Sequence, residues 1–233
     1  MPKRARVLVA IDGPAGAGKS TVARRVAERL GMVLVDTGAL YRWVALAASR
    51  AGLAFSDEER VGALASRLAE SRAIRLEADR ERGVRALLEG EDVSTAIRTP
   101  EMSLGASRVS AIPRVRDALF AMQRQAGEHG GVVLEGRDIG TVVFPDAEVK
   151  FFLTASPEER ATRRHRELLQ KGTPASFEDT LEDVVKRDKA DTERPVAPLR
   201  QADDAVVIDS STRSIDDVVD EMVALVSHRE THR

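Results

Sequence analysis

A glycine-rich stretch near the start of the chain has the most specific chemistry in the sequence. Gly13 to Ser20 match the phosphate-binding pattern G-x-x-x-x-G-K-[ST]. Backbone N–H groups of such a loop converge on phosphate oxygens, which requires glycine where the chain turns sharply or approaches the anion closely. Lys19 is placed to neutralise the β- and γ-phosphates, and the Ser20 hydroxyl to ligate Mg²⁺. The residues predicted to bind a nucleoside triphosphate are Gly13, Pro14, Ala15, Gly16, Ala17, Gly18, Lys19, Ser20 and Thr21.

The segments on either side of this loop have the pattern that the motif needs. Residues 7–11 are a continuous apolar run, which is typical of a buried parallel strand. Residues 20–30 place apolar side chains at helical spacing, and Gly31 is suited to end that helix. The positive end of the helix dipole then points at the bound anion. A glycine-rich turn in an unrelated α/β protein is the alternative, and the flanking strand and helix argue against it.

Four more apolar runs extend the predicted sheet. With the first strand, they lie at residues 7–11, 32–35, 132–134, 149–153 and 205–208. Two of them end in charged clusters, at residues 36–42 and 135–138. Because ligands gather beyond the carboxyl ends of strands in doubly wound α/β folds, we expect both clusters near the phosphate loop. Arg42, by its type a solvated helix arginine, is therefore expected to bind an anion.

An antiparallel hairpin is predicted between the second and third strands. Apolar and charged residues alternate over 74–78 and again over 84–88, with a turn at 81–83. A hairpin between two parallel strands indicates an inserted subdomain, which we place at residues 43–105. The predicted core domain then comprises the two remaining parts of the chain, residues 1–42 and 106–233.

Several helices have recognisable starts. The predicted starts are a capping box of Ser56 and Glu59 for a helix over 56–70, Thr99-Pro100, Ile112-Pro113, and Ser156-Pro157 with Glu159. The helix from 113 is expected to bury Val115 and Leu119. Arg116 lies outside this apolar face and is expected to be free for another role. A last helix is expected to bury Ile215 and to fray over residues 227–233.

Composition excludes several classes of protein. The chain has no cysteine, which excludes disulfides and thiolate metal sites, and its four histidines show no metal-ligand spacing. The net charge of −2 argues against a general nucleic-acid binder. No apolar run approaches the ~18 residues that span a bilayer, and we expect a cytoplasmic protein. The absence of asparagine excludes the guanine-reading motif of GTPases and the asparagine of a protein-kinase catalytic loop.

Arginines at predicted strand ends and in one helix narrow the reaction. They are Arg42, Arg137, Arg160, Arg163, Arg164, Arg187 and Arg194. Phosphoryl transfer needs two anionic reactants held in line and their charge neutralised, and guanidinium groups suit both tasks. So many arginines indicate a second phosphorylated substrate, as in a nucleoside monophosphate kinase. The arginines of the helix after residue 156 are open to two interpretations, a solvated face paired with nearby glutamates or a lid over phosphates.

The ordered motifs of the chain resemble those of bacterial cytidylate kinases. They are Asp12 to Thr21, Asp36 to Arg42, Leu88 to Ser94, Glu135 to Asp146, and Val196 to Leu199. Many families share the phosphate loop, whereas the stretch G-R-D-I-G-T-V-V-F-P-D and the hairpin insert are much more specific. The resemblance covers nearly the whole chain, from about Val7 to Val226.

The resemblance implies a fold and a reaction. The fold is α/β, a five-stranded parallel sheet of the P-loop NTPase type flanked by helices. A small insert with an antiparallel β-hairpin binds the nucleoside monophosphate, and a helical lid lies at about residues 157–195. The family transfers the γ-phosphoryl group of ATP to CMP or dCMP with Mg²⁺, in pyrimidine metabolism. The chain is expected to be a monomer that binds small nucleotides and neither nucleic acid nor membrane.

The resemblance also assigns site residues. The implied catalytic residues are Lys19, Arg137, Arg160, Arg187 and Arg194, and Arg163 joins the phosphate loop in binding ATP. Either Arg160 or Arg163 stacks on adenine. The implied CMP-binding residues are Thr37, Arg42, Ser107, Arg116, Arg137, Asp138 and Asp191. Ser20 is the implied Mg²⁺ ligand, and Asp36 is a candidate ligand through water.

Two other functions remain to be weighed. A small-molecule kinase of the shikimate or gluconate type would share the loop and the lid but not the set of residues that reads cytosine. A nucleotide-sensing module without turnover belongs to a different class, and the intact Lys19, Ser20 and Arg137 argue against it.

Overall fold

The computed structural model of the chain describes residues 4–71, 73–79, 83–170 and 172–232. The chain divides into two compact units, one of Met1–Val35 and Ala126–Arg233 and one of Asp36–Gln125. The predicted insert, residues 43–105, falls within the second unit. The predicted domain division stays a prediction, because a compact unit is not by itself an independently moving domain.

The first unit is built on a parallel sheet with the strand order β2-β6-β1-β7-β8. Its strands are β1 (Leu8–Asp12), β2 (Val33–Asp36), β6 (Val132–Gly136), β7 (Val149–Thr154) and β8 (Val206–Asp209). The central strand β1 pairs with β6 on one side and β7 on the other, in register from Leu8 opposite Val132 and from Val9 opposite Val149. The predicted five-stranded parallel sheet is confirmed.

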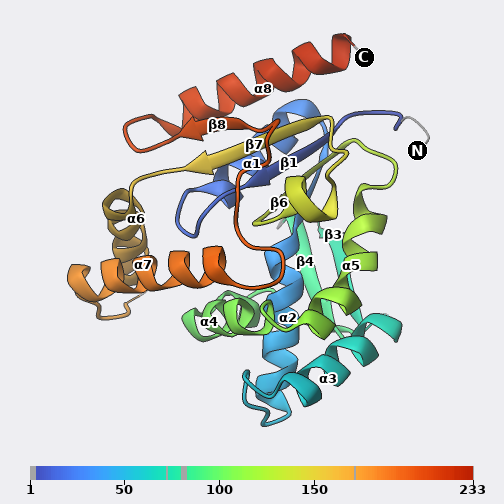
Figure 1. The fold of residues 1–233 in the computed structure, drawn as a ribbon, viewed down its shortest axis with the longest axis vertical. Coiled ribbons are helices and arrows are strands. Elements are labelled where there is room, and N and C mark those ends of the chain that lie inside the picture. Colours follow the sequence, from blue (N-terminus) through green and yellow to red (C-terminus); the bar gives the residue numbers. More distant parts are fainter. Residues whose placement is uncertain (1–3, 72, 80–82, 171, 233) are drawn as a thin grey trace. The chain divides into compact units, whose positions relative to one another are not determined.

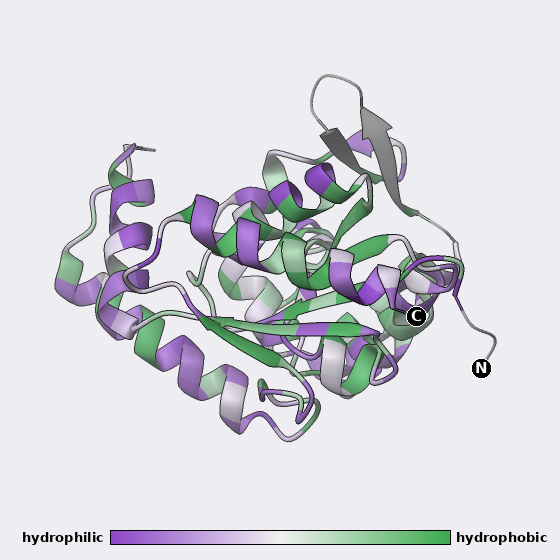
Figure 2. Ribbon diagram, turned by 90° about the horizontal axis from the view of Figure 1, so that it is seen from above, coloured by the Kyte–Doolittle hydropathy of each residue, from purple (hydrophilic) through white to green (hydrophobic). Residues whose placement is uncertain are grey.

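The helices of this unit are α1 (Lys19–Leu30), α6 (Pro157–Gln170), α7 (Phe177–Glu193) and α8 (Ile215–Thr231), with a short π-helix, η2 (Ile139–Val143), after β6. The helices α1 and α8 pack on the sheet, whereas α6 and α7 pack on each other. Alternate residues of β1 point to opposite faces, so Val9 and Ile11 pack with α1 and α8, whereas Leu8 and Ala10 pack against the segment 139–147. Figure 1 shows α8 running along the sheet, and Figure 2 shows hydrophobic residues concentrated on the strands.

The second unit is mainly helical. It comprises α2 (Thr37–Arg50), α3 (Glu58–Glu70), the 3-10 helix η1 (Ala96–Arg98), α4 (Pro100–Val109) and α5 (Pro113–Gly127), whose last two residues belong to the first unit. A small antiparallel sheet joins β3 (Ile74–Asp79), β4 (Gly83–Leu88) and β5 (Glu91–Asp92). The hydrophobic core of the second unit includes the fully buried Trp43. The predicted hairpin is confirmed, except that residues 81 and 82 of its turn lie outside the described residues.

Some local predictions are wrong for identifiable reasons. The strand β2 is not fully buried, and Val33 is 63% exposed because β2 lies at the edge of the sheet. Asp57 rather than Ser56 caps α3, since its carboxylate accepts from the N–H of Arg60. The end of α8 does not fray, because the helix continues to Thr231 and Glu230 pairs with Arg6. Ile215 is 48% exposed, since it occupies the first turn of that helix.

Other starts are confirmed. Thr99 caps α4 and Ser156 caps α6, through side-chain oxygens that accept from the N–H groups of Met102 and Glu159. Gly31 ends α1 in the left-handed conformation. The helix α7 lies within the predicted helical lid at residues 157–195, but no local pattern indicated its bounds, because its alternating charges hide a weak apolar stripe.

Candidate functional site

The phosphate-loop sequence lies between the central strand β1 and α1, and its glycines are sterically required. A Cβ on Gly13 would lie 2.0 Å from the carbonyl oxygen of Leu153, so no other residue fits there. Gly16 and Gly18 have positive φ angles of 79° and 88°, which glycine adopts readily. Among the described residues, no side chain caps the N-terminus of α1. Its first amides therefore keep their capacity to bind an anion.

Lys19 is buried beside this loop. Its Nζ donates to the carbonyl oxygen of Pro14 at 2.7 Å, and the residue is 6% exposed. Burial lowers the pKa of the Lys19 amine, and the positive charges of Arg137 and Arg187 lower it further against the opposing effect of Glu135 and Asp191. Several cationic groups are therefore concentrated around the loop lysine.

Ser20 has an acidic partner from the neighbouring strand. Its hydroxyl donates to Oε2 of Glu135 at 3.0 Å, and Glu135 is 4% exposed. Glu135 belongs to the charged cluster predicted at residues 135–138, but no role was predicted for it. The available signal was the apolar run over 132–134 that ends in a carboxylate, at a strand that pairs with β1.

The segment after β6 is joined to the end of α7 by two ion pairs. Nε of Arg137 donates to Oδ2 of Asp191 at 2.9 Å, and Nη2 of Arg194 lies 3.4 Å from Oδ1 of Asp138. Burial raises the pKa of Asp191, but the charges of Arg137 and Arg187 outweigh it, so that the net pKa lies below the ordinary value. Four predicted site residues of the first unit are thus brought together.

The arginines of α6 have different surroundings. Arg160 is 3% exposed, and Nη1 donates to the carbonyl of Ala15 at 3.0 Å and to Asp188 at 2.9 Å. Arg163 donates to Glu159 at 2.9 Å and to the carbonyl of Ser210 at 2.7 Å. Arg164, by contrast, lies 3.5 Å from Glu167 at the surface, and it makes no other ion pair with the described residues. The solvated-face interpretation thus fits Arg164, whereas Arg160 and Arg163 lie against the phosphate loop.

The second unit holds the other predicted site residues. Asp36 caps α2 by accepting from the N–H of Ala39 at 3.2 Å, and it pairs with Arg42 at 3.1 Å. Arg42 is therefore partnered rather than simply solvated. Thr37 is buried at the start of α2. Asp36, Thr37 and Arg42 all belong to the second unit.

Arg116 and Ser107 also lie in the second unit. Arg116 is more enclosed than its position outside the apolar face of α5 indicated, since the residue is 7% exposed with its guanidinium 5.7 Å from the centre of the Tyr41 ring. Stacking on an aromatic face explains this burial. Ser107 is half-buried, and its carbonyl accepts from the Ser110 hydroxyl at 2.9 Å.

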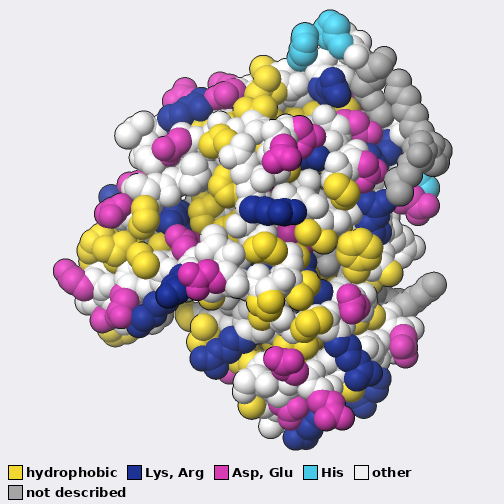
Figure 3. Space-filling view, in the orientation of Figure 1, with side chains coloured by type: hydrophobic (Ala, Val, Ile, Leu, Met, Phe, Trp, Pro, Cys, Tyr) yellow, Lys and Arg dark blue, Asp and Glu magenta, His cyan; other side chains and the backbone are white. Residues whose placement is uncertain are grey.

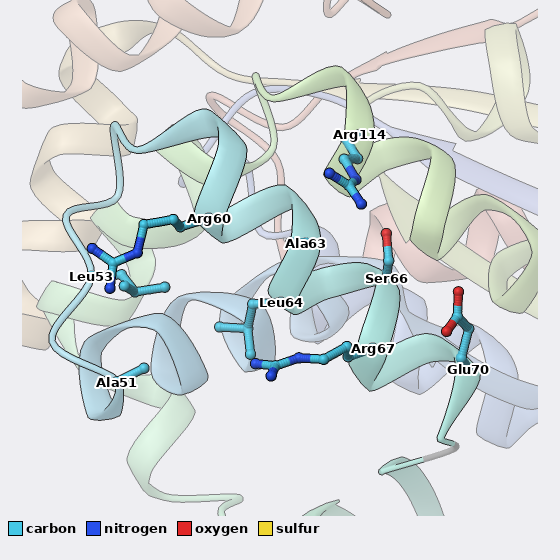
Figure 4. A pocket seen from close by; sticks show the side chains of 9 residues that line it. All are labelled: Ala51, Leu53, Arg60, Ala63, Leu64, Ser66, Arg67, Glu70 and Arg114. Carbon is cyan, nitrogen blue, oxygen red and sulfur yellow. The ribbon is translucent and has the colours of Figure 1, made fainter.

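A pocket of about 480 Å³ lies elsewhere in the second unit, beside α3 (Figure 4). The residues that line it include Leu53, Leu64 and the arginines Arg60, Arg67 and Arg114. None of the predicted nucleotide-binding residues is among those that line it. The pocket is therefore separate from the residues assigned to ATP or CMP.

Among the described residues, no group of three or more His, Cys, Asp or Glu side chains is arranged to hold a metal ion. None of the helices within the described ranges is long and apolar enough to cross a bilayer.

Comparison with known proteins adds independent information. A family model described as cytidylate kinase matches residues 9–228. A cytidylate kinase of Syntrophotalea carbinolica is 54% identical over 225 residues, covering 97% of this chain and 94% of that protein. One of Geobacter sulfurreducens is 51% identical over 228 residues, covering 97% and 95%. An uncharacterized protein from Eubacterium ventriosum aligns with a TM-score of 0.52 at 13% identity, over 96% of this chain and 99% of that one, a likeness of fold alone.

These matches extend well beyond the widely shared phosphate loop. They include the segment after β6 and the second unit, where the motifs specific to the predicted family lie. The resemblance seen in the sequence is thereby confirmed, and the chain belongs to the cytidylate kinase family.

Proposed function

We propose that this protein transfers the γ-phosphoryl group of ATP to CMP or dCMP, giving ADP and CDP or dCDP. Membership of the cytidylate kinase family supports the reaction. The observation that carries it in the structure is the concentration of cations around the phosphate loop. Arg160 donates to the carbonyl of Ala15 in the loop at 3.0 Å, and Lys19 is buried. The charges of Arg137 and Arg187 lower the pKa of the Lys19 amine, and those of Glu135 and Asp191 oppose this effect. Such a group of cations stabilises the charge that two phosphorylated reactants bring together.

The donor side is assigned to the phosphate loop and α6. Lys19 neutralises the transferring phosphoryl group, while the loop amides and the N-terminus of α1 bind the other phosphates. Arg160 already donates to the carbonyl of Ala15, so we propose that it shapes the loop as well as adding charge. Arg163, half-buried beside Gly18, is then the better candidate to cover ATP.

The acceptor residues are proposed from the family resemblance. Arg42 and Arg137, with Thr37, are proposed to bind the CMP phosphate, and Arg187 and Arg194 to neutralise the phosphates in exchange. Cytosine has an exocyclic amine where uracil has an oxygen, so an acceptor such as Asp138 discriminates against UMP. The remaining proposed contacts are Ser107 and Arg116 to the base and Asp191 to the ribose.

The residues near Ser20 fit a magnesium ion. Mg²⁺ prefers oxygen ligands and is held by few protein groups, water and phosphate oxygens. The Ser20 hydroxyl and the Glu135 carboxylate already meet at 3.0 Å, which provides two such oxygens at one point. We propose that Ser20 is a direct ligand and that Glu135 acts through water, with Asp36 as a further water-mediated candidate. When bound, the ion neutralises phosphate charge and helps to align the donor.

The wider context is proposed on more general grounds. We propose a monomeric cytoplasmic enzyme of pyrimidine nucleotide metabolism, because its substrates are small cytoplasmic nucleotides. The net charge of −2, and the acidic and basic side chains interspersed on the face shown in Figure 3, support small-molecule rather than nucleic-acid partners. Sedimentation at enzyme-assay concentration would test the monomer.

The test is ADP production from ATP and Mg²⁺ with CMP, dCMP, UMP, AMP, GMP, shikimate or gluconate as acceptor. We expect turnover with CMP and dCMP and far less with UMP. Equal use of UMP would retain the kinase but reject the base-reading role of Asp138. Turnover of shikimate or gluconate alone would indicate the other kinase class, and tight ATP binding without any turnover a sensing module.

Two variants assign the residues. Lys19→Ala should lose at least ~10³-fold in kcat while its circular dichroism stays unchanged, because it removes transition-state charge stabilisation. Asp138→Ala should raise the KM for CMP more than that for ATP. An equal rise in both would contradict its assignment to the base. Arg164→Ala, which changes a surface arginine of α6, is the control for loss of positive charge.

A further inference from the structure

Asp12 is a buried carboxylate that the proposed reaction does not use. It ends β1, directly before Gly13 of the phosphate loop, and it is 4% exposed. Its Oδ1 accepts from the backbone N–H of Ile139 at 2.9 Å, and its Oδ2 from that of Gly140 at 2.7 Å. Both oxygens thus bind the backbone of a segment far away in the sequence.

These two amides need partners from outside their own helix. Ile139 and Gly140 begin the π-helix η2, and the first N–H groups of a helix have no intrahelical acceptor. The preceding residue, Asp138, provides no side-chain cap to η2. Asp12 therefore caps η2 from a different strand.

The packing around Gly140 allows this approach. A Cβ on Gly140 would lie 3.1 Å from Cδ of Lys150 and 3.4 Å from Oδ2 of Asp12. The backbone therefore lies against the carboxylate with little room for a side chain. A π-helix is uncommon, and such helices are frequent at functional sites.

The residues just before η2 are the ones assigned to the acceptor. Arg137 and Asp138 are held on their other side by α7, through Asp191 and Arg194. The segment 137–140 is consequently fixed from two directions, by ion pairs to α7 and by the Asp12 carboxylate. Within the first unit, the latter is the direct link between the base of the phosphate loop and this segment.

Burial disfavours the charged form of the Asp12 carboxylate that makes these two hydrogen bonds. Burial raises the pKa of Asp12 to about 6, against the opposing effect of the two backbone hydrogen bonds. The charged groups that face it are Lys19 on α1, Asp138 before η2, and Lys150 on β7 by way of Gly140. Lys150 is engaged with Asp204 at 2.8 Å, so it is not a dedicated counter-ion for Asp12.

We propose that Asp12 is a positioning residue, which holds the segment carrying Arg137 and Asp138 in register with the phosphate loop. This inference rests on the proposed function, since it assumes that Arg137 and Asp138 bind the acceptor. We assign no substrate contact to Asp12, whose two carboxylate oxygens accept from backbone amides. Its effect should therefore appear in acceptor recognition more than in ATP binding.

The test uses Asp12→Asn and Asp12→Ala in the full chain, with KM for CMP and for ATP measured separately. Asparagine has the same shape and keeps one acceptor oxygen, but its NH₂ faces the second amide donor; alanine loses both acceptors. We expect the KM for CMP to rise about tenfold for asparagine and more for alanine, as expected for lost charge-assisted hydrogen bonds. The KM for ATP should change by less than about threefold on the same argument.

Glu148→Gln is the matched control. Glu148 also accepts a backbone N–H of β1, from Leu8 at 2.9 Å, but at the opposite end of the strand. It has no assigned role in the reaction, and both KM values should stay within about twofold of the wild type. An equal rise of the KM for CMP in this variant would overturn the specific role of Asp12.

Hydrogen exchange gives a readout that does not depend on turnover. Peptides that contain residues 139 and 140 should exchange faster in Asp12→Asn, while those of the phosphate loop and α8 keep their rates. Unchanged exchange, an unchanged KM for CMP, or equal rises for CMP and ATP would each overturn the inference. Failure of the proposed function is distinguishable, because the wild-type protein would then show no turnover of CMP at all.

Discussion

Asp12 and Asp36 both end a strand of the same parallel sheet, and each follows an apolar run, yet the structure uses them differently. Asp12 ends the central strand β1, is 4% exposed, and binds two amides of a segment more than a hundred residues away. Asp36 ends the edge strand β2 and has a side chain that is 31% exposed. It caps the helix that follows it and pairs with Arg42, six residues away.

The position of the strand explains this difference. The central strand has neighbours on both sides, so the carboxylate at its end meets the segment that leaves β6 and is shielded from water. The edge strand has one neighbour. The carboxylate at its end therefore binds residues that follow it closely in the sequence, Ala39 and Arg42. A strand-end acid thus becomes a long-range link at the centre of a sheet and a local cap at its edge.

The largest expected effect of the difference between Asp12 and Asp36 is on the pH dependence of stability. The pKa of Asp12 is raised from 3.8 to about 6 in the folded protein, which corresponds to about 3 kcal/mol. The folded state therefore binds this proton more tightly than the unfolded state does. The stabilising contribution is fully present below pH 3.8 and is lost as the pH rises through about 6.

Asp12→Asn isolates this effect, because all other groups titrate equally in both proteins. Between about pH 4.5 and about pH 7.5, the wild type should lose about 2 to 3 kcal/mol of unfolding free energy relative to the variant. Urea denaturation at several pH values measures the difference. A difference that does not change with pH would show that burial of Asp12 has no such cost and would remove the contrast with Asp36.

Two glycine substitutions test whether the surroundings of Asp12 are packed more tightly than those of Asp36. Gly140→Ala places a Cβ 3.1 Å from Lys150 and 3.4 Å from the Asp12 carboxylate, inside the core. Gly38→Ala places one 3.0 Å from Oδ1 of Asp36, but that carboxylate is half-exposed and can turn. We expect Gly140→Ala to lower the unfolding free energy by about 1 to 3 kcal/mol.

Gly38→Ala is the matched control for this effect. It should change stability by less than about 1 kcal/mol in either direction, because alanine also favours the helix α2. Thermal and urea unfolding of both variants provide the measurement. Similar losses in the two would mean that the centre and the edge of the sheet restrain their acids equally.

Much of this arrangement follows from local sequence patterns. Apolar runs, the glycine loop and the capping residues Thr99 and Ser156 predict the strands and helix starts, because each depends on neighbours in the sequence. Glu135 and Asp12 were recognisable only as acids at strand ends. Their partners, Ser20 and the amides of residues 139 and 140, depend on which strands are adjacent.

The burial of two arginines could not be predicted for the same reason. The burial of Arg116 depends on the Tyr41 ring, and the burial of Arg160 on Asp188 and the carbonyl of Ala15. Periodicity does not reveal such partners. It also failed for α7, where most residues are charged or polar and packing against α6 rather than pattern stabilises the helix.

The smallest expected effect separates the two roles considered for Asp36. Asp36→Ala removes a helix cap and should cost about 1 kcal/mol, as should Asp57→Ala, which removes the similar cap of α3. Serine caps helices about as well as aspartate, so Asp36→Ser should retain most of the stability. If Asp36 also binds Mg²⁺ through water, this serine variant should need more Mg²⁺ for half-maximal turnover. An unchanged Mg²⁺ requirement at unchanged stability would leave Asp36 with its capping role and Arg42 as its partner, which is the local use expected of an acid at the edge of the sheet.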